Sequence, residues 1–172
     1  MKKIIFISLF LIGLNVVSQN DYTSAINRDS DALAKAFLKN DFKTIANFTH
    51  KSILNLIGGK ENMASVLTQE MEKMIADGYG FKDVKIGPPR QIYTAGDELH
   101  CLVSQKIVLS LKDEIITANS YLLAISSDKG KTWTFIDTAK INNENILELL
   151  PHFNTNLKFP KKAALIITKN EE

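Results

Sequence analysis

The stretch 99–137 constrains the fold more than any other part of the chain, because its residues alternate as they do in a β-sheet. Three segments rich in β-branched and aromatic residues, Leu99–Leu111, Ile115–Ser126 and Thr132–Asp137, are separated by short polar turns. Period-two alternation bounded by turn formers is typical of strands. We therefore predict a three-stranded antiparallel meander. A two-residue first turn and a three-residue first turn would direct the side chains of the second strand to opposite faces of the sheet, so the sequence leaves the register undecided.

The first of these strands is the more apolar at its odd positions, from Cys101 to Leu111. We expect the odd side chains to face the covered side of the sheet, because successive strand residues point to opposite faces. The second strand is not polar on either side. Both of its faces are therefore expected to be covered at least in part.

The second turn of the meander carries the most specific local pattern in the chain. Ser126, Asp128, Gly130, Thr132 and Trp133 stand in the order S-x-D-x-G-x-T-W, which resembles the Asp-box hairpin of sialidases and related propellers. An aspartate in such a turn accepts backbone N–H groups, and a glycine takes a positive φ without a Cβ clash. In that motif the residues are structural. This sequence has one copy and no repeat, so we interpret the pattern as a tight turn and not as a sialidase.

The N-terminus has the pattern of a secretory signal peptide over residues 1–18. Lys2 and Lys3 precede an apolar run, Ile4–Leu14, and small residues lead to a cleavage position after Ser18. The run is too short to cross a bilayer well, so we expect a secreted or periplasmic protein without stable membrane insertion after cleavage. A retained N-terminal anchor is the alternative. No cysteine lies near the cleavage position, so no lipid attachment is expected.

The charge balance bears on the partner. Removal of two of the 21 basic residues with the signal peptide leaves 19, which equals the number of acidic residues. A formal charge of zero argues against nucleic acid, because phosphate binding needs a basic surplus or patch. Cys101 is the sole cysteine, so the chain forms no internal disulfide.

We divide the rest of the chain by its pattern into three parts. Residues 19–29 are a polar lead-in, residues 30–150 form a single α+β domain, and residues 151–172 are a C-terminal tail. The domain is expected to end in a helix over Asn143–Leu150, capped by the preceding asparagine. In the tail, the apolar run Ala163–Thr168 has strand propensity, and we expect it to dock on a sheet edge or on a partner.

Helical spacing marks three segments before the meander. Asp29 or Ser30 is expected to cap the first helix, and Asp41 the second. The clearest helix is Met63–Ile75, whose apolar residues form one stripe, and Gly78 is suited to end it.

Strand signals occupy three further segments. We expect strands at Lys51–Ile57, Phe81–Ile86 and Arg90–Thr94. Pro88 and Pro89 predict an edge, a bulge or a bend, because proline cannot donate to the ladder.

The resulting order of elements resembles the nuclear transport factor 2-like superfamily, the cone-shaped α+β fold shared with ketosteroid isomerase and polyketide-cyclase relatives. The resemblance is carried by Asn40-Asp41 between the first helices, by Gly58-Gly59 before the third, and by the bent strand at the two prolines. It implies N-terminal helices packed on a curved antiparallel sheet that encloses a pocket. A cystatin-like arrangement, one helix against a curved sheet, is the second choice. Enzymatic members place an acid or a His–Asp pair in the pocket, and no position here matches their motifs.

Polar residues on otherwise apolar strands are the candidate ligand-binding residues. They are Tyr93, Gln105, Asn119, Tyr121 and Asp137. If several of them converge inside the cone, they would orient a small ligand, because pockets place a few polar groups on apolar walls. The alternative is that each one bonds a neighbouring strand or faces water.

Other reactive residue types suggest no further site. His50, His100 and His152 lack the spacing of metal ligands, so we expect no metal and no cofactor. We place His50 in a solvated loop. Cys101 is expected to be a buried, inert thiol.

We carry three hypotheses for the function. The preferred one is a secreted, non-catalytic module that binds a small apolar molecule or a partner protein. The second is an enzyme of the isomerase or hydratase kind, with Asp137 as base and Tyr121 or Tyr93 as donor, which requires Asp137 at a substrate-sized cavity. The third is an assembly protein that donates its C-terminal strand to a neighbour; a homodimer is included among the expected partners.

Overall fold

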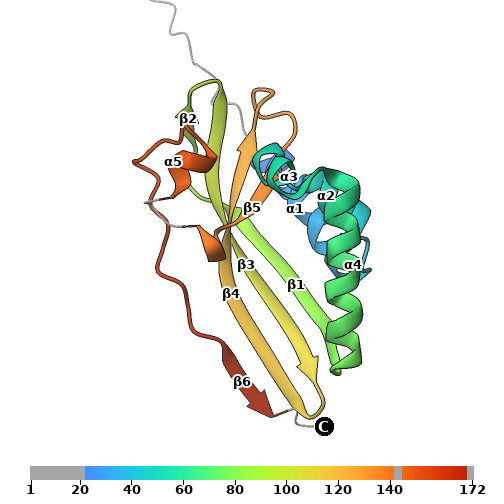
Figure 1. Ribbon diagram of the computed structural model, residues 1–172. Coiled ribbons are helices and arrows are strands. Elements are labelled where there is room, and N and C mark those ends of the chain that lie inside the picture. Colours follow the sequence, from blue (N-terminus) through green and yellow to red (C-terminus); the bar gives the residue numbers. More distant parts are fainter. Residues whose placement is uncertain (1–21, 142–144, 170–172) are drawn as a thin grey trace, which may run out of the picture.

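The computed structural model describes residues 22–141 and 145–169, so the expected signal peptide over residues 1–18 lies outside the described residues. In this part of the chain, helices come first and an antiparallel sheet of six strands follows (Figure 1). This order confirms the α+β class and agrees with the resemblance to the nuclear transport factor 2-like fold. The elements are α1 (Thr23–Leu38), α2 (Phe42–Phe48), α3 (Lys51–Ile57), α4 (Lys60–Ala76), β1 (Tyr79–Pro89), β2 (Tyr93–Ala95), β3 (Glu98–Leu111), β4 (Glu114–Ser126), β5 (Thr134–Asp137), the 3-10 helix η1 (Thr138–Lys140), α5 (Ile146–Leu149) and β6 (Ile166–Lys169).

The meander is present as predicted, and its register is now fixed. Strands run in the order β1-β3-β4-β5, and β2 also pairs with β3. Leu111 pairs with Glu114, so the first turn is the two-residue Lys112-Asp113. Odd residues of β3 and even residues of β4 consequently share one face.

The outer edge of β4 is shared by two short strands. Strand β5 pairs with residues 122–125 of β4, and β6 pairs with residues 114–117. Residues 118–121 of this edge have no strand partner within the described part of the chain. The tail strand therefore docks on a sheet edge, as predicted, and the edge it uses is the chain's own β4. It spans Ile166–Lys169, whereas the predicted run was Ala163–Thr168.

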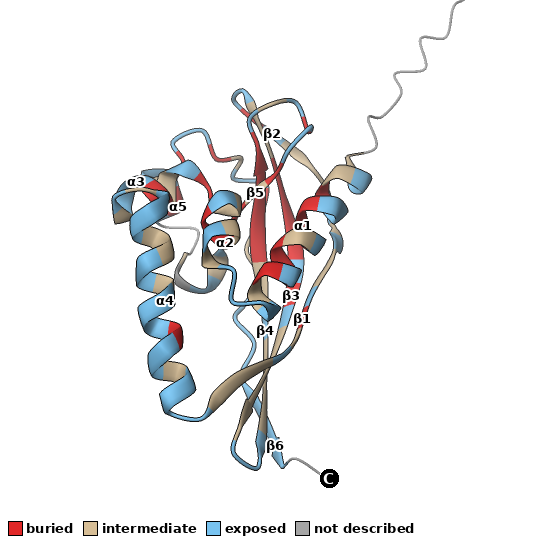
Figure 2. Cartoon of the chain, turned by 90° about the vertical axis from the view of Figure 1, so that its right-hand side faces the viewer, coloured by how far each residue is buried: buried red, intermediate tan, exposed pale blue. Residues whose placement is uncertain are grey.

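Each face of the sheet has its own hydrophobic core at the end that carries β5 (Figure 2). On the helix side, odd residues of β3 pack against α1 and α2, and on the opposite side even residues of β3 pack against α5 and the segment after it. The helix-side core comprises Ile26, Leu33, Ala36, Ile45, Cys101, Val103, Leu122, Ala124, Trp133 and Phe135. The opposite core comprises Leu102, Leu123, Ile125, Ile136, Ile146, Leu150, Phe153 and Leu157. This confirms that the odd residues of β3 face a covered side of the sheet and that both faces of β4 are covered in part.

Helix α1 begins earlier than predicted. It starts at Thr23 and runs through Asp29 and Ser30, so neither of these residues caps it. The carboxylate of Asp29 instead accepts the backbone N–H of Trp133 at 2.8 Å and pairs with Arg28. A residue type that is common at helix N-termini is here a long-range acceptor, which the local pattern does not reveal.

Lys51–Ile57 is helix α3 and not the predicted strand. Its side chains form a short apolar run, a pattern that helices and strands share. The helix is set by its ends, because His50 accepts the Ser52 N–H as the N-cap and Gly58 takes the left-handed conformation after it. His50 is buried, so its prediction as a solvated loop residue is also wrong. Asp41 caps α2 through the N–H of Thr44, as predicted.

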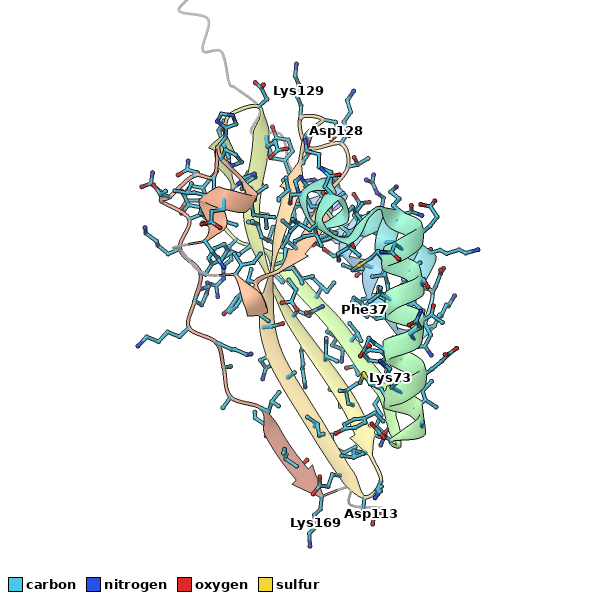
Figure 3. The ribbon with its side chains drawn as sticks, in the orientation of Figure 1. Phe37, Lys73, Asp113, Asp128, Lys129 and Lys169 are labelled. Atoms are coloured by element: carbon cyan, nitrogen blue, oxygen red, sulfur yellow. The ribbon has the colours of Figure 1, made fainter. Side chains whose placement is uncertain are left out.

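Helix α4 spans the predicted amphipathic segment and ends before Gly78, which has a positive φ. It packs mainly against α2, on the helix side of the sheet. Met71 is buried, whereas Val66 and Ile75 are exposed, so part of the apolar stripe remains open to solvent. Phe37 of α1 contacts the Phe81 ring in the space beside this helix (Figure 3).

The turn 126–133 is a tight reversal held by Asp128, at the tip of the β4–β5 hairpin (Figure 3). The Asp128 carboxylate accepts the N–H groups of Lys131 and Thr132 and the hydroxyls of Thr132 and Ser126. Partial burial acts to raise the pKa of Asp128, but these hydrogen bonds outweigh it and lower the pKa to about 2. Trp133 is buried, and its indole N–H donates to the carbonyl of Gly130.

The remaining connections agree in outline with the sequence. Strand β1 lies at a sheet edge, and its register shifts between Ile86 and Pro89, which confirms the irregularity at the proline pair. The strand expected over Arg90–Thr94 is shorter, since β2 begins at Tyr93. The cap predicted for α5 lies in 142–144, outside the described residues.

None of the helices in the described ranges has the length and apolar character that crossing a membrane requires.

Candidate functional site

The candidate site is a cavity of about 580 Å³ where α1 approaches the middle of the sheet. Asp31 and Ala34 of α1 form one wall. The sheet contributes residues 84–87 of β1, 104–106 of β3 and 119–121 of β4, and Lys161 and Ala163 of the C-terminal segment close one side. The cavity therefore joins elements from both ends of the chain. Its volume is within the range of small-molecule sites.

A hydrogen-bonded polar pair lies beside the apolar residues Val84 and Ile86 in the lining of this cavity. Gln105 is 4% exposed, and its side-chain oxygen accepts the Ser120 hydroxyl at 3.0 Å. The two residues are opposite each other in the β3–β4 register, on the helix-side face. The hydrogen bond to Ser120 uses the oxygen of the Gln105 amide, and among residues 22–141 and 145–169 no acceptor bonds its NH₂ group, so this donor is available to a ligand.

Three of the five residues predicted from the sequence line this cavity, namely Gln105, Asn119 and Tyr121. Strand alternation directs the side chains of Asn119 and Tyr121 to the face opposite Gln105. The Tyr121 hydroxyl accepts a hydrogen bond from Arg90 at 2.8 Å, and the Arg90 guanidinium also lies 4.6 Å from the ring centroid. Asn119 and Tyr121 also line a hollow of about 260 Å³ at the β4 edge, beside the C-terminal segment.

The structure does not bring the other two predicted residues to the cavity. Tyr93 lies on β2, where its hydroxyl bonds Gln91, and it packs against the opposite core. Asp137 is exposed, and its carboxylate accepts the N–H of Ala139 as the cap of η1. Asp137 does not line the cavity, so the geometric condition set for it as a catalytic base is not met.

A second polar cluster, which the sequence did not predict, surrounds Glu98 at the start of β3. His100 Nε2 lies 3.2 Å from one carboxylate oxygen, and His50 Nε2 lies 3.8 Å from the other. Lys51 and Ser127 contact the latter oxygen at 3.2 Å and 2.9 Å. Glu98 thus connects α3, β3 and the β4–β5 hairpin.

Burial sets the charge state of this cluster. It lowers the pKa of both His50 and His100 below the ordinary value of 6.5, and the neighbouring Glu98 carboxylate only partly offsets that effect. Burial acts to raise the pKa of Glu98 itself, but hydrogen bonds from His100, Ser127 and Lys51 outweigh it and hold the pKa below 4.5. The two imidazoles are therefore neutral at pH 7. This cluster could not be predicted from the sequence, because its members are distant in the chain and come together only in the folded protein.

The cluster is not arranged as a metal centre. Within the described ranges, no set of three or more His, Cys, Asp or Glu side chains could hold an ion. Cys101 is buried on the helix side of β3, and burial raises the pKa of its thiol to about 12. The thiolate that a nucleophilic role would need is therefore disfavoured.

Comparison with known proteins gives similarity to solved structures only. No protein-family model matches the chain, and no curated protein matches it. A ketosteroid isomerase-like protein from Erwinia carotovora atroseptica has 16% sequence identity and a TM-score of 0.45, with 67% of this chain and 92% of that chain covered. An LEH-like epoxide hydrolase from M. tuberculosis has 18% identity and a TM-score of 0.34, with 75% of this chain and 91% of that chain covered.

Proposed function

We propose that this protein is a secreted, non-catalytic binding module that holds a small, mainly apolar molecule in the cavity between α1 and the sheet. The observation that carries the proposal is the unpaired amide NH₂ of Gln105 in a cavity of about 580 Å³. This NH₂ group is not one of the buried side-chain atoms that lack a partner, so it is open to solvent in the cavity. A ligand that supplies an acceptor would take the place of water there.

The lining indicates the kind of ligand. Ala34, Val84 and Ile86 provide apolar walls, and three lysines of the lining add positive charge, namely Lys85, Lys106 and Lys161. A molecule with an apolar body and a carbonyl, carboxylate or sulfonate group would satisfy both features. Asp31 of α1 also lines the cavity and disfavours an anionic group beside that helix.

The distribution of titratable groups supports binding over catalysis. His50, Glu98 and His100 have shifted pKa values, and none of them lines the cavity. Asp137, the base of the isomerase or hydratase hypothesis, caps η1 outside it. A general base has to lie within hydrogen-bond reach of the proton it removes.

Secretion is part of the proposal and rests on the sequence of residues 1–18. Mass spectrometry of the protein recovered from its native cell envelope or medium would test it. We expect a mature chain that begins at Gln19, and a chain that retains Met1 would contradict the proposal.

The binding proposal is tested with anilinonaphthalene sulfonate, a fluorescent probe with an apolar body and one anionic group. We expect Q105L to weaken probe binding about fivefold, because one net hydrogen bond contributes about 1 kcal/mol. A34F would fill the cavity and abolish binding. The matched control is Q69L on the exposed face of α4, which should bind as the wild type does.

The binding test is valid only for variants that remain folded. Fluorescence of Trp133, which is buried in the helix-side core, reports whether each variant is folded. A folded A34F variant with unchanged probe affinity would contradict the proposal. The same conclusion would follow if the wild-type protein did not bind the probe.

A further inference from the structure

The end of the sheet that carries β6 is apolar and has no covering layer of its own. We call it the distal tip; it comprises residues 106–118 of the β3–β4 hairpin and residues 161–169 of the C-terminal segment. No residue in either range is buried, and residues 161–169 are all exposed. Figure 2 shows this end of the strands without the buried residues that fill the end beside β5. The aliphatic side chains of the tip are Ile107, Val108, Leu109, Leu111, Ile115, Ile116, Leu165, Ile166 and Ile167.

Strand β6 exposes apolar side chains on both faces of the sheet. Ile166 lies opposite Thr117 in the register, and the next residue, Ile167, lies opposite Ile116. Because neighbouring residues of a strand point to opposite faces, Ile166 is on one face and Ile167 on the other. They are 52% and 58% exposed, and Leu165 beside them is 62% exposed. Exposed apolar surface of this extent is typical of sites that bind a protein or a membrane.

The charges of the distal tip are mainly basic. Within residues 106–118 and 161–169, five lysines stand against two acidic residues. The lysines are Lys106, Lys112, Lys161, Lys162 and Lys169, and the acidic residues are Asp113 and Glu114. Lysines therefore flank the apolar strand at both ends, with Lys161 and Lys162 before it and Lys169 as its last residue.

We propose that the distal tip docks on a membrane surface of anionic phospholipids. The aliphatic side chains of β6 lie at the boundary of the acyl chains, and the lysines at both ends of the strand contact the phosphate groups. Apolar side chains flanked by basic residues are typical of proteins that bind at this interface. The long lysine side chains reach the headgroups from a strand that lies flat on the surface.

The backbone of β6 limits how deep the tip enters. Its outer edge has no strand partner among the described residues. Unpaired N–H and C=O groups are not tolerated in the hydrocarbon of a bilayer. The strand therefore stays at the level where headgroups and water bond its backbone, and the association is peripheral.

A lipid surface suits the tip better than a protein partner does. In a complex of two copies through β6, Lys161, Lys162 and Lys169 of one copy would face the same lysines of the other, and like charges repel. An acidic strand added to the outer edge of β6 would satisfy its backbone. It would leave the apolar side chains of at least one face in water, whereas acyl chains contact both faces.

Sedimentation with vesicles tests the proposal. The chain used begins at Gln19, so that the apolar run Ile4–Leu14 does not contribute to binding. We expect it to sediment with vesicles made of equal parts of phosphatidylglycerol and phosphatidylcholine, and to remain in solution with phosphatidylcholine alone. Binding should weaken as the salt concentration is raised, because mobile ions screen the attraction between lysines and phosphates.

A pair of charge variants shows where the vesicles bind. Each lysine near an anionic surface strengthens binding about fivefold, so K162Q/K169Q should bind roughly 25-fold more weakly than the wild type. The matched control is K129Q/K131Q, which removes the same charge from the β4–β5 hairpin. Figure 3 shows Lys129 and Lys169 at opposite ends of the molecule, so this control should bind nearly as the wild type does.

The apolar contribution is tested separately. I166S/I167S should weaken vesicle binding at least about tenfold, because it removes two aliphatic side chains that would be buried in the interface. L56S is the matched control, since Leu56 on α3 is 76% exposed. E171Q/E172Q should strengthen binding, because Glu171 and Glu172, which lie outside the described residues, bring acidic charge close to β6 in the sequence. Circular dichroism confirms that each variant is folded.

Several results would overturn the proposal. One is a wild-type chain that does not sediment with anionic vesicles; if it forms a complex with polyglutamate instead, the tip is a site for an acidic protein. Equal binding by K162Q/K169Q and its control would also contradict the proposal, as would wild-type binding by I166S/I167S. A34F, which fills the cavity at Gln105, should bind vesicles as the wild type does. Loss of vesicle binding in folded A34F would assign the lipid to the cavity and not to the tip.

Discussion

Replacement of Asp29 by alanine tests how the N-terminal helix is fixed to the hairpin. The Asp29 side chain is 9% exposed, and one of its oxygens accepts the Trp133 backbone N–H at 2.8 Å. The same carboxylate accepts two hydrogen bonds from Arg28, which in turn donates to the carbonyl of Lys131. One side chain therefore connects α1 to the start of β5.

The expected loss of stability in D29A comes mainly from the buried backbone N–H of Trp133. The Arg28 side chain is 59% exposed, so its ion pair with Asp29 contributes little. Loss of the carboxylate leaves the Trp133 N–H without its acceptor, which costs about 1–3 kcal/mol. We expect D29A to lower the free energy of unfolding by about 2 kcal/mol, or the melting temperature by roughly 4–8 °C for a chain of this size. D29N keeps one oxygen and should lose about half as much.

Urea unfolding measures the effect directly, because Trp133 is the sole tryptophan and is buried. The matched control is D31A, an exposed aspartate on the same helix, which should change stability by less than about 0.5 kcal/mol. If D29A is as stable as D31A, the reasoning that assigns Asp29 this role is refuted.

Three further predictions concern the cores and the hairpin. Burial lowers the pKa of His50 and His100 in the folded protein, so on acidification the unfolded chain takes up protons at a higher pH than the folded one. Stability should therefore decrease, and with it the urea concentration at the unfolding midpoint, as the pH is lowered from about 7.5 to about 5.5; a midpoint that does not change with pH would contradict this. G130A should lower stability by more than about 1 kcal/mol in the same assay, since a Cβ at Gly130 would overlap the Tyr22 ring and φ is +84°; wild-type stability would argue against it. Cys101 should react with a thiol reagent only after unfolding, and rapid labelling of the native protein would show that it is accessible.

Much of the fold could be predicted from local pattern because the sheet is built from long alternating strands. β3 and β4 each have many alternating residues, and Asp41 and Gly78 are strong end signals for helices. Prediction failed where an apolar run was short. The segment 51–57 is too short for periodicity to separate a helix from a strand.

The candidate site was accessible to sequence reasoning only in part. Gln105 could be predicted as a candidate because it is the polar residue among the apolar odd positions of β3, and the structure places it at the cavity. The contact of Asp29 with Trp133 and the cluster around Glu98 were not predicted, because the residues involved are distant from one another in the chain. A buried histidine and a solvated one have the same appearance in a single sequence.

The most direct test of the binding account is a map of where anilinonaphthalene sulfonate binds on the isotope-labelled protein. Backbone amide chemical shifts would be followed during a titration. The account predicts that the largest shifts occur at Ala34, Gln105 and Ser120, which lie on different elements around one cavity. Shifts confined to the exposed residues of β6, or spread evenly over the surface, would contradict it.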